Sequence, residues 1–275
     1  MKRQQRLVWL AVHLLLVLAL LLCLFPVYWI FQISLKTQVE AFKVPPSWIF
    51  KPTFRHYVKL LTEGDFPGRL FNSAVVSTFS TLFGLLIGTP AAYVMSRLKF
   101  RLKNLVLLLV LSSRMVPPIS FIIPYFLVYI NIGLMDTRIG LIIIRVGFSL
   151  GLIVWAMWTY FDEIPLELDE AAEIDGASVI QIIRHVILPV SAAGLTSTGI
   201  LCFIMAWNDY LFALILTRTR AVTAPVEITR ALAYQAEDLG LATAGAIIVA
   251  LPAIMFSLFV RKYLKTGIMG GAIKG

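Results

Sequence analysis

Residues 170–178 read Glu-Ala-Ala-Glu-Ile-Asp-Gly-Ala-Ser and residues 188–189 read Leu-Pro, within a polar insert between two long apolar stretches. An apolar helix can vary freely while it stays apolar, whereas this insert specifies acids, small residues, a bend and a second helix start in order. Gly176 permits a backbone conformation that residues with a Cβ resist, and Ser178 with Gln181 matches a capping box. We therefore predict a short helix that ends at Gly176, a second helix after it, and a docking surface for a partner.

The charge of the insert supports this interpretation. Small side chains at Ala171, Ala172 and Ala177 would let a partner approach the helix backbone closely. The alternative is a solvated acidic loop, which is what most charge runs are, but that alternative does not explain the small residues, the glycine and Leu-Pro together. Residues 162–175 of the insert contain no Lys or Arg and hold seven of the fifteen acids of the chain: Asp162, Glu163, Glu167, Asp169, Glu170, Glu173 and Asp175.

The composition excludes an ordinary soluble domain, because 59% of the residues are hydrophobic and 14% are charged, against about a quarter charged in soluble domains. About 20 apolar residues in a helix cross a hydrocarbon layer of about 30 Å. Six runs of that kind lie near residues 7–31, 70–95, 105–130, 139–161, 190–216 and 239–260. The predicted fold class is therefore all-α, a polytopic membrane protein of six transmembrane helices with the insert between the fourth and the fifth.

Basic residues orient this topology. Lys2, Arg3 and Arg6 precede the first run, a second cluster lies in residues 97–103, and a third follows the last run at residues 261–265. With six crossings the three clusters share one side, which the positive-inside rule makes cytoplasmic. The first run is long and lacks a small-residue cleavage pattern, so we interpret it as an uncleaved anchor rather than a signal peptide. The insert and both termini are expected to be cytoplasmic, and the net charge of +9 reflects topology rather than nucleic-acid binding.

The insert resembles the EAA loop of inner-membrane permease subunits of binding-protein-dependent ABC importers, on residues 170–178 and 188–189. Trp-Asn-Asp-Tyr at 207–210 and the ending Gly-Ile-Met-Gly-Gly-Ala-Ile-Lys-Gly at 267–275 are similar to carbohydrate permeases of the maltose-transporter type. The resemblance covers nearly the whole chain. Two positions depart from the family pattern, which often has Phe at Ile183 and Pro at Ala193.

The resemblance implies an ATP-driven importer of a sugar or sugar derivative in a bacterial or archaeal cytoplasmic (inner) membrane. Its implied partners are a second permease that completes a heterodimer, two copies of a cytoplasmic ABC ATPase, and a soluble or lipid-anchored substrate-binding protein. No Gly-x-x-x-x-Gly-Lys-Ser/Thr phosphate loop occurs in the chain, so ATP and Mg²⁺ would bind to the ATPase. This chain would bind no cofactor and would be a transport subunit rather than an enzyme.

The resemblance also assigns residues to the ATPase contact, where Glu170 would meet a basic group. The resemblance divides the chain into three parts. These are an anchor with a periplasmic segment at 1–69, a core transmembrane domain at 70–261 with its coupling loop at 162–188, and a cytoplasmic tail at 262–275. The alternative for the end of the tail is a frayed terminus. The coupling residues would be Glu170, Ala171, Ala172, Asp175, Gly176, Ala177, Ser178, Leu188 and Pro189, with a C-terminal contact at Gly270, Gly271, Lys274 and Gly275.

Ionisable groups inside the apolar runs point to the transport pathway, because each costs at least about 2.5 kcal/mol in lipid and normally faces the protein interior. Arg114, Arg145 and Asp209 are such groups. Arg145 and Asp209 both lie about 10 Å from the outer ends of their runs, at about 1.5 Å per residue. We expect a salt bridge between them, or a polar site shared with Asn208, that lines the outer half of the cavity. The alternative is a structural pair that holds the fourth and fifth helices together. An unpaired arginine facing a cavity would favour an anionic sugar derivative.

Aromatic side chains with a polar edge suit the binding of a sugar. The alternative is that they belong to the aromatic belt at the membrane interface. The candidates are Tyr125, Tyr129, Trp207 and Tyr210.

Two other classes of function were weighed against the importer. An ion-coupled secondary transporter of a small polar solute would also be polytopic, but such proteins commonly show internal repeats, and no convincing repeat is present. An intramembrane enzyme would need a converging nucleophile, base or metal set. His13, His56 and His185 lie far apart in sequence, so we predict neither a catalytic residue nor a metal site.

Overall fold

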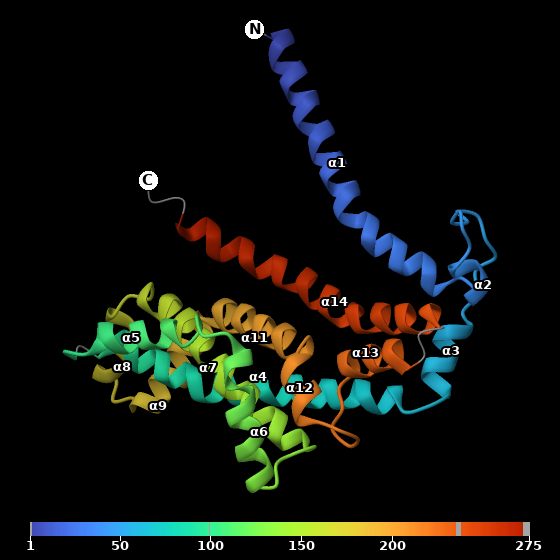
Figure 1. Ribbon diagram of the computed structural model, residues 1–275. Helices are drawn as coiled ribbons and strands as arrows, with labels where there is room; N and C mark the ends of the chain where they lie inside the picture. The colour runs from blue at the N-terminus through green and yellow to red at the C-terminus, as the bar shows by residue number, and fades with distance from the viewer. Residues whose placement is uncertain (1, 99, 235–237, 272–275) are drawn as a thin grey trace. The chain divides into compact units, whose positions relative to one another are not determined.

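The computed structural model describes residues 2–98, 100–234 and 238–271 of the chain, and in these ranges its regular structure is helical, without strands (Figure 1). The prediction of an all-α fold is confirmed. The longer helices are α1 (Lys2–Ser34), α4 (Phe66–Arg97), α7 (Arg138–Asp162), α11 (Ala192–Trp207) and α14 (Leu239–Gly271). The shorter ones are α2 (Gln38–Ala41), α3 (Arg55–Thr62), α5 (Lys103–Ser112), η1 (Pro118–Phe121), α6 (Ile122–Asn131), α8 (Glu167–Ile174), α9 (Val179–Ile182), η2 (Ile183–Ile187), α10 (Leu188–Val190), α12 (Leu211–Leu216) and α13 (Ala224–Tyr234).

Four helices of the described chain are long and apolar enough to cross a membrane, namely residues 8–34 of α1, all of α4, all of α7 and residues 239–259 of α14. They coincide with the first, second, fourth and sixth predicted runs. The third run is interrupted between α5 and α6, because Pro117 and Pro118 lack the amide hydrogens that a continuous helix needs. The fifth is interrupted between α11 and α12. The predicted count of six transmembrane helices is therefore not confirmed exactly, since the described chain has four candidates, or five if residues 179–190 and α11 form one bent span.

The fifth apolar run, predicted near residues 190–216, is entered through a bend. Helix α10, which contains Pro189, ends one residue before Ser191, and residues 179–190 meet α11 at an angle of 82°. Ser191 Oγ donates a hydrogen bond to the carbonyl of Ile187 at 2.7 Å, and such back-bonding by serine often bends helices. The spanning helix therefore begins at Ala192, after the bend.

The chain packs as two units, each with its own interior. The first unit consists of residues 1–67 and 227–250, and the second of residues 68–226 and 251–275. The boundaries fall within helices α4, α13 and α14. The division at residues 69 and 261 drawn from the sequence stays a prediction.

In the first unit, the end of α1 is fixed by a buried lysine. The ammonium of Lys36 lies over the rings of Trp29 and Phe50, at 5.6 and 5.0 Å from their centroids, which stabilises the charge in an apolar setting. The carbonyl of Lys36 accepts a hydrogen bond from His56 Nε2 at 2.9 Å, and His56 Nδ1 lies 3.3 Å from the Asp238 carboxylate. The most apolar stretch of α1 has no buried residue, so lipid or another chain must cover it.

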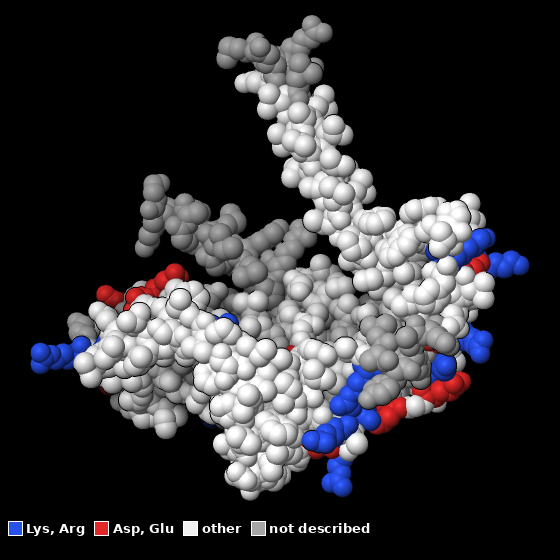
Figure 2. Space-filling model, in the orientation of Figure 1, with Lys and Arg blue, Asp and Glu red and all other residues white. Residues whose placement is uncertain are grey.

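In the second unit, α5 and α11 pack along α7 (Figure 1). An apolar cluster around Leu141 and Ile144 joins α7 to α4, α6 and α12, and a second cluster around Ile153 and Phe161 joins α7 to α4, α9, η2 and α11. Gly194 is needed where α11 crosses α7, because a Cβ there would come within 2.5 Å of the ring of Tyr160. On the face drawn in Figure 2, the surface over α5 and α6 carries almost no charged side chains, as expected of a surface covered by lipid or a partner.

A carboxylate in the turn between α6 and α7 organises the segment that follows α12. Asp136 adopts a φ of 55°, which is uncommon for a residue other than glycine. Its carboxylate accepts the backbone amides of Arg218, Thr219, Arg220 and Ala221 at 2.9–3.2 Å and the Thr219 hydroxyl at 2.9 Å. Burial by itself would raise the pKa of Asp136, but these donors favour the charged form and together hold the pKa well below its ordinary value.

Replacing Asp136 with Asn is expected to destabilise the protein by about 2 kcal/mol at neutral pH, because it loses charge-assisted hydrogen bonds. The stabilisation is fully present above the unfolded-state pKa of about 3.9 and is lost as the pH falls from there toward the lowered pKa. Thermal unfolding of the detergent-purified protein between pH 7 and pH 3.5 measures this. The difference in unfolding temperature between wild type and Asp136→Asn should shrink below about pH 4. Glu63→Gln, which neutralises an exposed acid, should unfold at the same temperature as wild type. A difference in unfolding temperature between wild type and Asp136→Asn that does not change with pH would contradict this account.

Candidate functional site

Helix α8 forms and ends as the sequence predicts. Its first turn contains Glu167, Asp169 and Glu170, whose negative charges favour the amino end of a helix. Gly176 adopts a φ of 81°. Its amide donates to the Glu173 carbonyl, and the amide of Ala177 donates to the Ala172 carbonyl, both at 3.0 Å. These two bonds make a Schellman motif, so the predicted break at Gly176 is confirmed.

The second part of the insert starts with the predicted capping box. Gln181 Oε1 accepts the backbone amide of Ser178 at 2.7 Å, and α9 begins at the next residue. From Ile183 to Ile187 the helix widens into a π turn, a feature that is frequent at functional sites. Helix α10 completes the insert, and residues 167–190 are called the α8–α10 segment below.

The inner face of the α8–α10 segment is held by apolar packing. Ile182 and Ile187 are fully buried in the cluster that contains Phe161 of α7. Ala172 and Ala177, two of the alanines predicted to admit a partner, pack against the same cluster. Their small size therefore brings α8 close to this chain's own helices, a role that the sequence could not distinguish from contact with a partner.

The outer face of the segment is exposed and mixes apolar and acidic groups. Ile174 and Ile180, on either side of the Gly176 bend, are 86% and 77% exposed. Around them the predicted coupling residues Glu170, Ala171 and Asp175 are also exposed. With the exposed Val179, the two isoleucines place three apolar side chains around one bend, and exposed apolar groups that gather in this way mark interaction sites. The remaining predicted residues of the segment divide between exposed positions (Gly176, Ser178 and Pro189) and a half-buried one (Leu188).

The structure brings the predicted pair of charges together. Arg145 Nη1 of α7 lies 3.4 Å from Asp209 Oδ1, with 12% and 11% of their side chains exposed. The backbone amides of Phe212 and Ala213 at the start of α12 also favour the charged form of Asp209. The pair therefore joins α7 to the break between α11 and α12. Asn208, predicted to share a polar site with this pair, instead donates its amide to the Ile204 carbonyl of its own helix.

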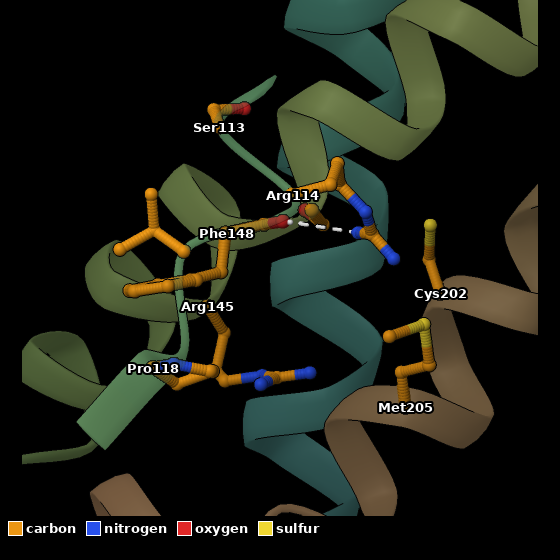
Figure 3. Close-up of a pocket in the computed structure, with 9 residues that line it drawn as sticks. Ser113, Arg114, Pro118, Arg145, Phe148, Cys202 and Met205 are labelled. Atoms are coloured by element: carbon orange, nitrogen blue, oxygen red, sulfur yellow. Dashed lines mark hydrogen bonds between the residues drawn. The ribbon is translucent and has the colours of Figure 1, made fainter. Parts of the chain in front are cut away.

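A cavity of about 130 Å³ lies beside this pair, between α7, α11 and the segment after α5. Figure 3 shows the guanidinium groups of Arg114 and Arg145 pointing toward the side of α11 that carries Cys202 and Met205. Arg114 donates to the Phe148 carbonyl at 3.5 Å. Among the described residues no carboxylate forms a salt bridge with it.

The four predicted aromatic residues do not converge on one site. Tyr129 is buried, and its hydroxyl donates to the Gly140 carbonyl at 2.9 Å, which makes it a packing residue of the cluster around Leu141. Trp207 is 5% exposed and stacks on Phe203. Tyr125 packs edge-on against Tyr129. Tyr210 remains at the surface. The sequence placed these side chains in the right spans but could not tell which faced the interior.

The predicted C-terminal contact is only partly described. Helix α14 continues to Gly271, so Gly270 and Gly271 are at its end, while Lys274 and Gly275 lie outside the described residues. Within the described ranges no three His, Cys, Asp or Glu side chains group as metal ligands would.

Sequence reasoning missed one residue of the site. Asp169, at the third position of α8, is buried against α4, although in the sequence it belongs to the same acidic run as its neighbours. It lies three residues before Ala172, which also faces the interior, so the helical spacing carried a signal. The spacing identifies Asp169 as buried only when another residue of α8 is already known to face inward.

Residues 81–267 match the family described as binding-protein-dependent transport system inner membrane component. The chain belongs to this family. It is 40% identical to the trehalose transport system permease protein SugB of Mycobacterium tuberculosis, over 92% of this chain and 93% of that protein. It is 35% identical to the trehalose/maltose transport system permease protein MalG of Thermococcus litoralis, over 94% of each.

A solved structure of an ABC transporter contains a chain with a fold similar to that of this permease. A bacterial ABC transporter involved in the import of the acidic polysaccharide alginate contains a chain with a TM-score of 0.78 and 26% identity, covering 95% of this chain and 98% of that one. The chain is thus a multi-pass permease subunit of the ABC importer type and a transport component rather than an enzyme. The alternative of an ion-coupled secondary transporter is not supported.

Proposed function

We propose that this permease forms half of the translocation pathway for a sugar or sugar derivative, and that the α8–α10 segment couples it to a cytoplasmic ABC ATPase. The names of its relatives, which concern trehalose, maltose and alginate, support the substrate class. The observation that carries the coupling role is the exposed bend with Ile174 and Ile180, held from behind by a buried apolar cluster. A partner that grips this bend displaces the helices behind it.

The complete transporter is proposed to contain a second permease, two ATPase copies and a soluble or lipid-anchored binding protein. ATP and Mg²⁺ bind to the ATPase, whose closure switches the permease pair between inward-facing and outward-facing states. Both termini and the α8–α10 segment lie on the cytoplasmic side of the inner membrane. The interrupted helices α5–α6 and α11–α12 then serve as the third and fifth crossings, since broken helices are tolerated where they lie inside protein.

On this proposal Glu170 and Asp175 face basic groups of the ATPase, and Ala171 permits close approach. Gly176 and Ser178 shape the bend, while Leu188 and Pro189 lead into α11. Ala172 and Ala177 support the segment from within. A second contact with the ATPase dimer is made by Gly270, Gly271, Lys274 and Gly275 of the tail.

Site-directed cross-linking tests the docking face. Ile174→Cys and Ile180→Cys, in a background where the exposed Cys23 is replaced by Ser, are expected to cross-link to the co-purified ATPase subunit in a nucleotide-dependent manner. Ile139→Cys is the matched control, because this residue is also exposed but lies at the opposite end of α7. If the two bend positions give no more ATPase adduct than residue 139, the docking proposal is wrong.

Reconstituted uptake tests the substrate class. Proteoliposomes with internal ATP and external binding protein should accumulate at least one sugar from a panel of trehalose, maltose and an acidic oligosaccharide. The acidic compound belongs in the panel because Arg114 lines the cavity. Uptake driven by an ion gradient without ATP would contradict the proposal.

A further inference from the structure

A buried polar contact joins the α8–α10 segment to the end of a spanning helix. The two carboxylate oxygens of Asp169 are divided between two residues of α4. Oδ1 accepts the hydroxyl of Tyr93 at 2.5 Å, and Oδ2 lies 2.9 Å from Arg97 Nη2. Arg97 Nη1 also donates to the Phe161 carbonyl of α7 at 3.0 Å. We call Tyr93, Arg97 and Asp169 the α4–α8 node.

The burial of Asp169 sets it apart from the other acids of the insert. All seven lie within the described residues, and Asp169 is 4% exposed while the other six are classed as exposed. A solvated acidic loop does not account for this residue, because burying a carboxylate is costly unless it is paired and hydrogen-bonded. Replacing a buried ion pair by apolar side chains is often neutral or stabilising. Stability alone is therefore a weak reason for the node.

The node joins parts of the chain that are distant in sequence. Helix α8 follows α7 after a short turn and leads to α11 through α9, η2 and α10, so its covalent neighbours are α7 and α11. Its polar attachment to α4 is the node, 72 to 76 residues away along the chain. The hydrogen bond of 2.5 Å from Tyr93 is directional, and the ion pair of Arg97 with Asp169 is short, so a displacement of α8 must carry Tyr93 and Arg97 with it or break both contacts.

We infer that the α4–α8 node transmits displacement of the α8–α10 segment to α4, and that Asp169, Arg97 and Tyr93 are positioning residues of the coupling step rather than ATPase contacts. This inference rests on the proposed function. Helix α4 is long enough to cross the membrane, so motion imposed at its Arg97 end reaches the opposite surface. Without the node, force on α8 would act on α7 and α11 through the chain but on α4 through apolar contacts alone.

The test compares variants of the whole transporter complex in proteoliposomes, with substrate uptake and ATP hydrolysis measured together. Tyr93→Phe removes one hydroxyl and keeps the ion pair. Asp169→Asn removes the charge. Arg97→Asp with Asp169→Arg exchanges the two charges. Glu163→Gln is the matched control, since it removes an exposed acid just before α8 without touching the node.

The expected result is uncoupling rather than loss of ATP hydrolysis. In Asp169→Asn the substrate transported per ATP hydrolysed should fall at least fivefold while the hydrolysis rate stays within twofold of wild type. Tyr93→Phe should lower the same ratio at least twofold, and the charge exchange should recover part of it. A ratio within twofold of wild type for Asp169→Asn, and unchanged for Tyr93→Phe, would overturn the inference. If Asp169→Asn does not assemble, the result for Tyr93→Phe decides.

A distance measurement separates transmission from a merely structural role. Spin labels at Val94→Cys on α4 and Leu201→Cys on α11, two exposed positions, report the separation of these helices in a Cys23→Ser background. A trapped ATP state should change this distance in the wild type and change it by less than half as much in Tyr93→Phe. An equal change in both would overturn the inference alone. A wild-type complex that imports no sugar with ATP would overturn the proposed function together with it.

Discussion

Replacing Asp209 with Asn is expected to lower ATP-driven uptake more than tenfold, because it leaves the Arg145 guanidinium charged and without its counter-ion inside the bundle. The two side chains are 3.4 Å apart and nearly nine-tenths covered. Removing one partner of a buried pair typically costs about 3–5 kcal/mol, most of which is the cost of the remaining charge. Because Asn keeps the size of the side chain and one of its oxygens, this variant tests the charge apart from the packing around position 209.

The exchange of both charges provides the control. Arg145→Asp and Asp209→Arg should each reduce uptake and the yield of assembled transporter, and the double variant should recover part of both. Recovery is expected to be incomplete, since the exchanged side chains differ in length from the original ones at both positions. Uptake and thermal stability would be measured on the same preparations. Wild-type uptake in Asp209→Asn would show that the pair is dispensable.

Replacing Gly176 with Ala is expected to reduce uptake at least fivefold with little change in the amount of assembled transporter. Its φ of 81° lies in the left-handed region, where a side chain costs about 1–2 kcal/mol. No other atom lies within 4 Å of a Cβ built there, so the strain is in the backbone alone. Relief of that strain rotates α9 relative to α8, and Ile174 and Ile180 no longer present one surface.

Gly133→Ala is the matched control for this prediction. Gly133 has a φ of 69° and is also free of atoms within 4 Å of a built Cβ, but it lies in the turn between α6 and α7. Both variants should lose similar thermal stability, and only the change at Gly176 should lower the transport rate. If the two changes reduce uptake equally, general destabilisation explains the effect and the bend has no special role.

The sequence predicted the features that depend on composition and on near neighbours. Apolar runs too long for a soluble core identify a membrane protein. The helix ending at Gly176 and the capping box at Ser178 follow from contacts within a few residues, so they were readable without the fold. The pairing of Arg145 with Asp209 could also be predicted, because two isolated opposite charges at similar depth in a membrane are stabilised by pairing with each other.

Other features of the site required the packed structure. Asp169 looks like its acidic neighbours in sequence and differs only because α4 places Tyr93 and Arg97 beside it. Tyr129 and Trp207 look like sugar-binding aromatics until their burial is known. In a membrane span nearly every face of a helix is apolar, so periodicity does not reveal which face is inward.

What the sequence by itself determined is thus the membrane class, the permease family and the two short helices around Gly176, because these depend on composition and on bonds between near neighbours. Only the tertiary structure decided that Asp169 faces inward, that the fifth apolar run is broken between α11 and α12, and that Ala172 and Ala177 support the segment from behind. These properties depend on which distant side chains come together, and an apolar sequence leaves many such arrangements nearly equal in solvation energy.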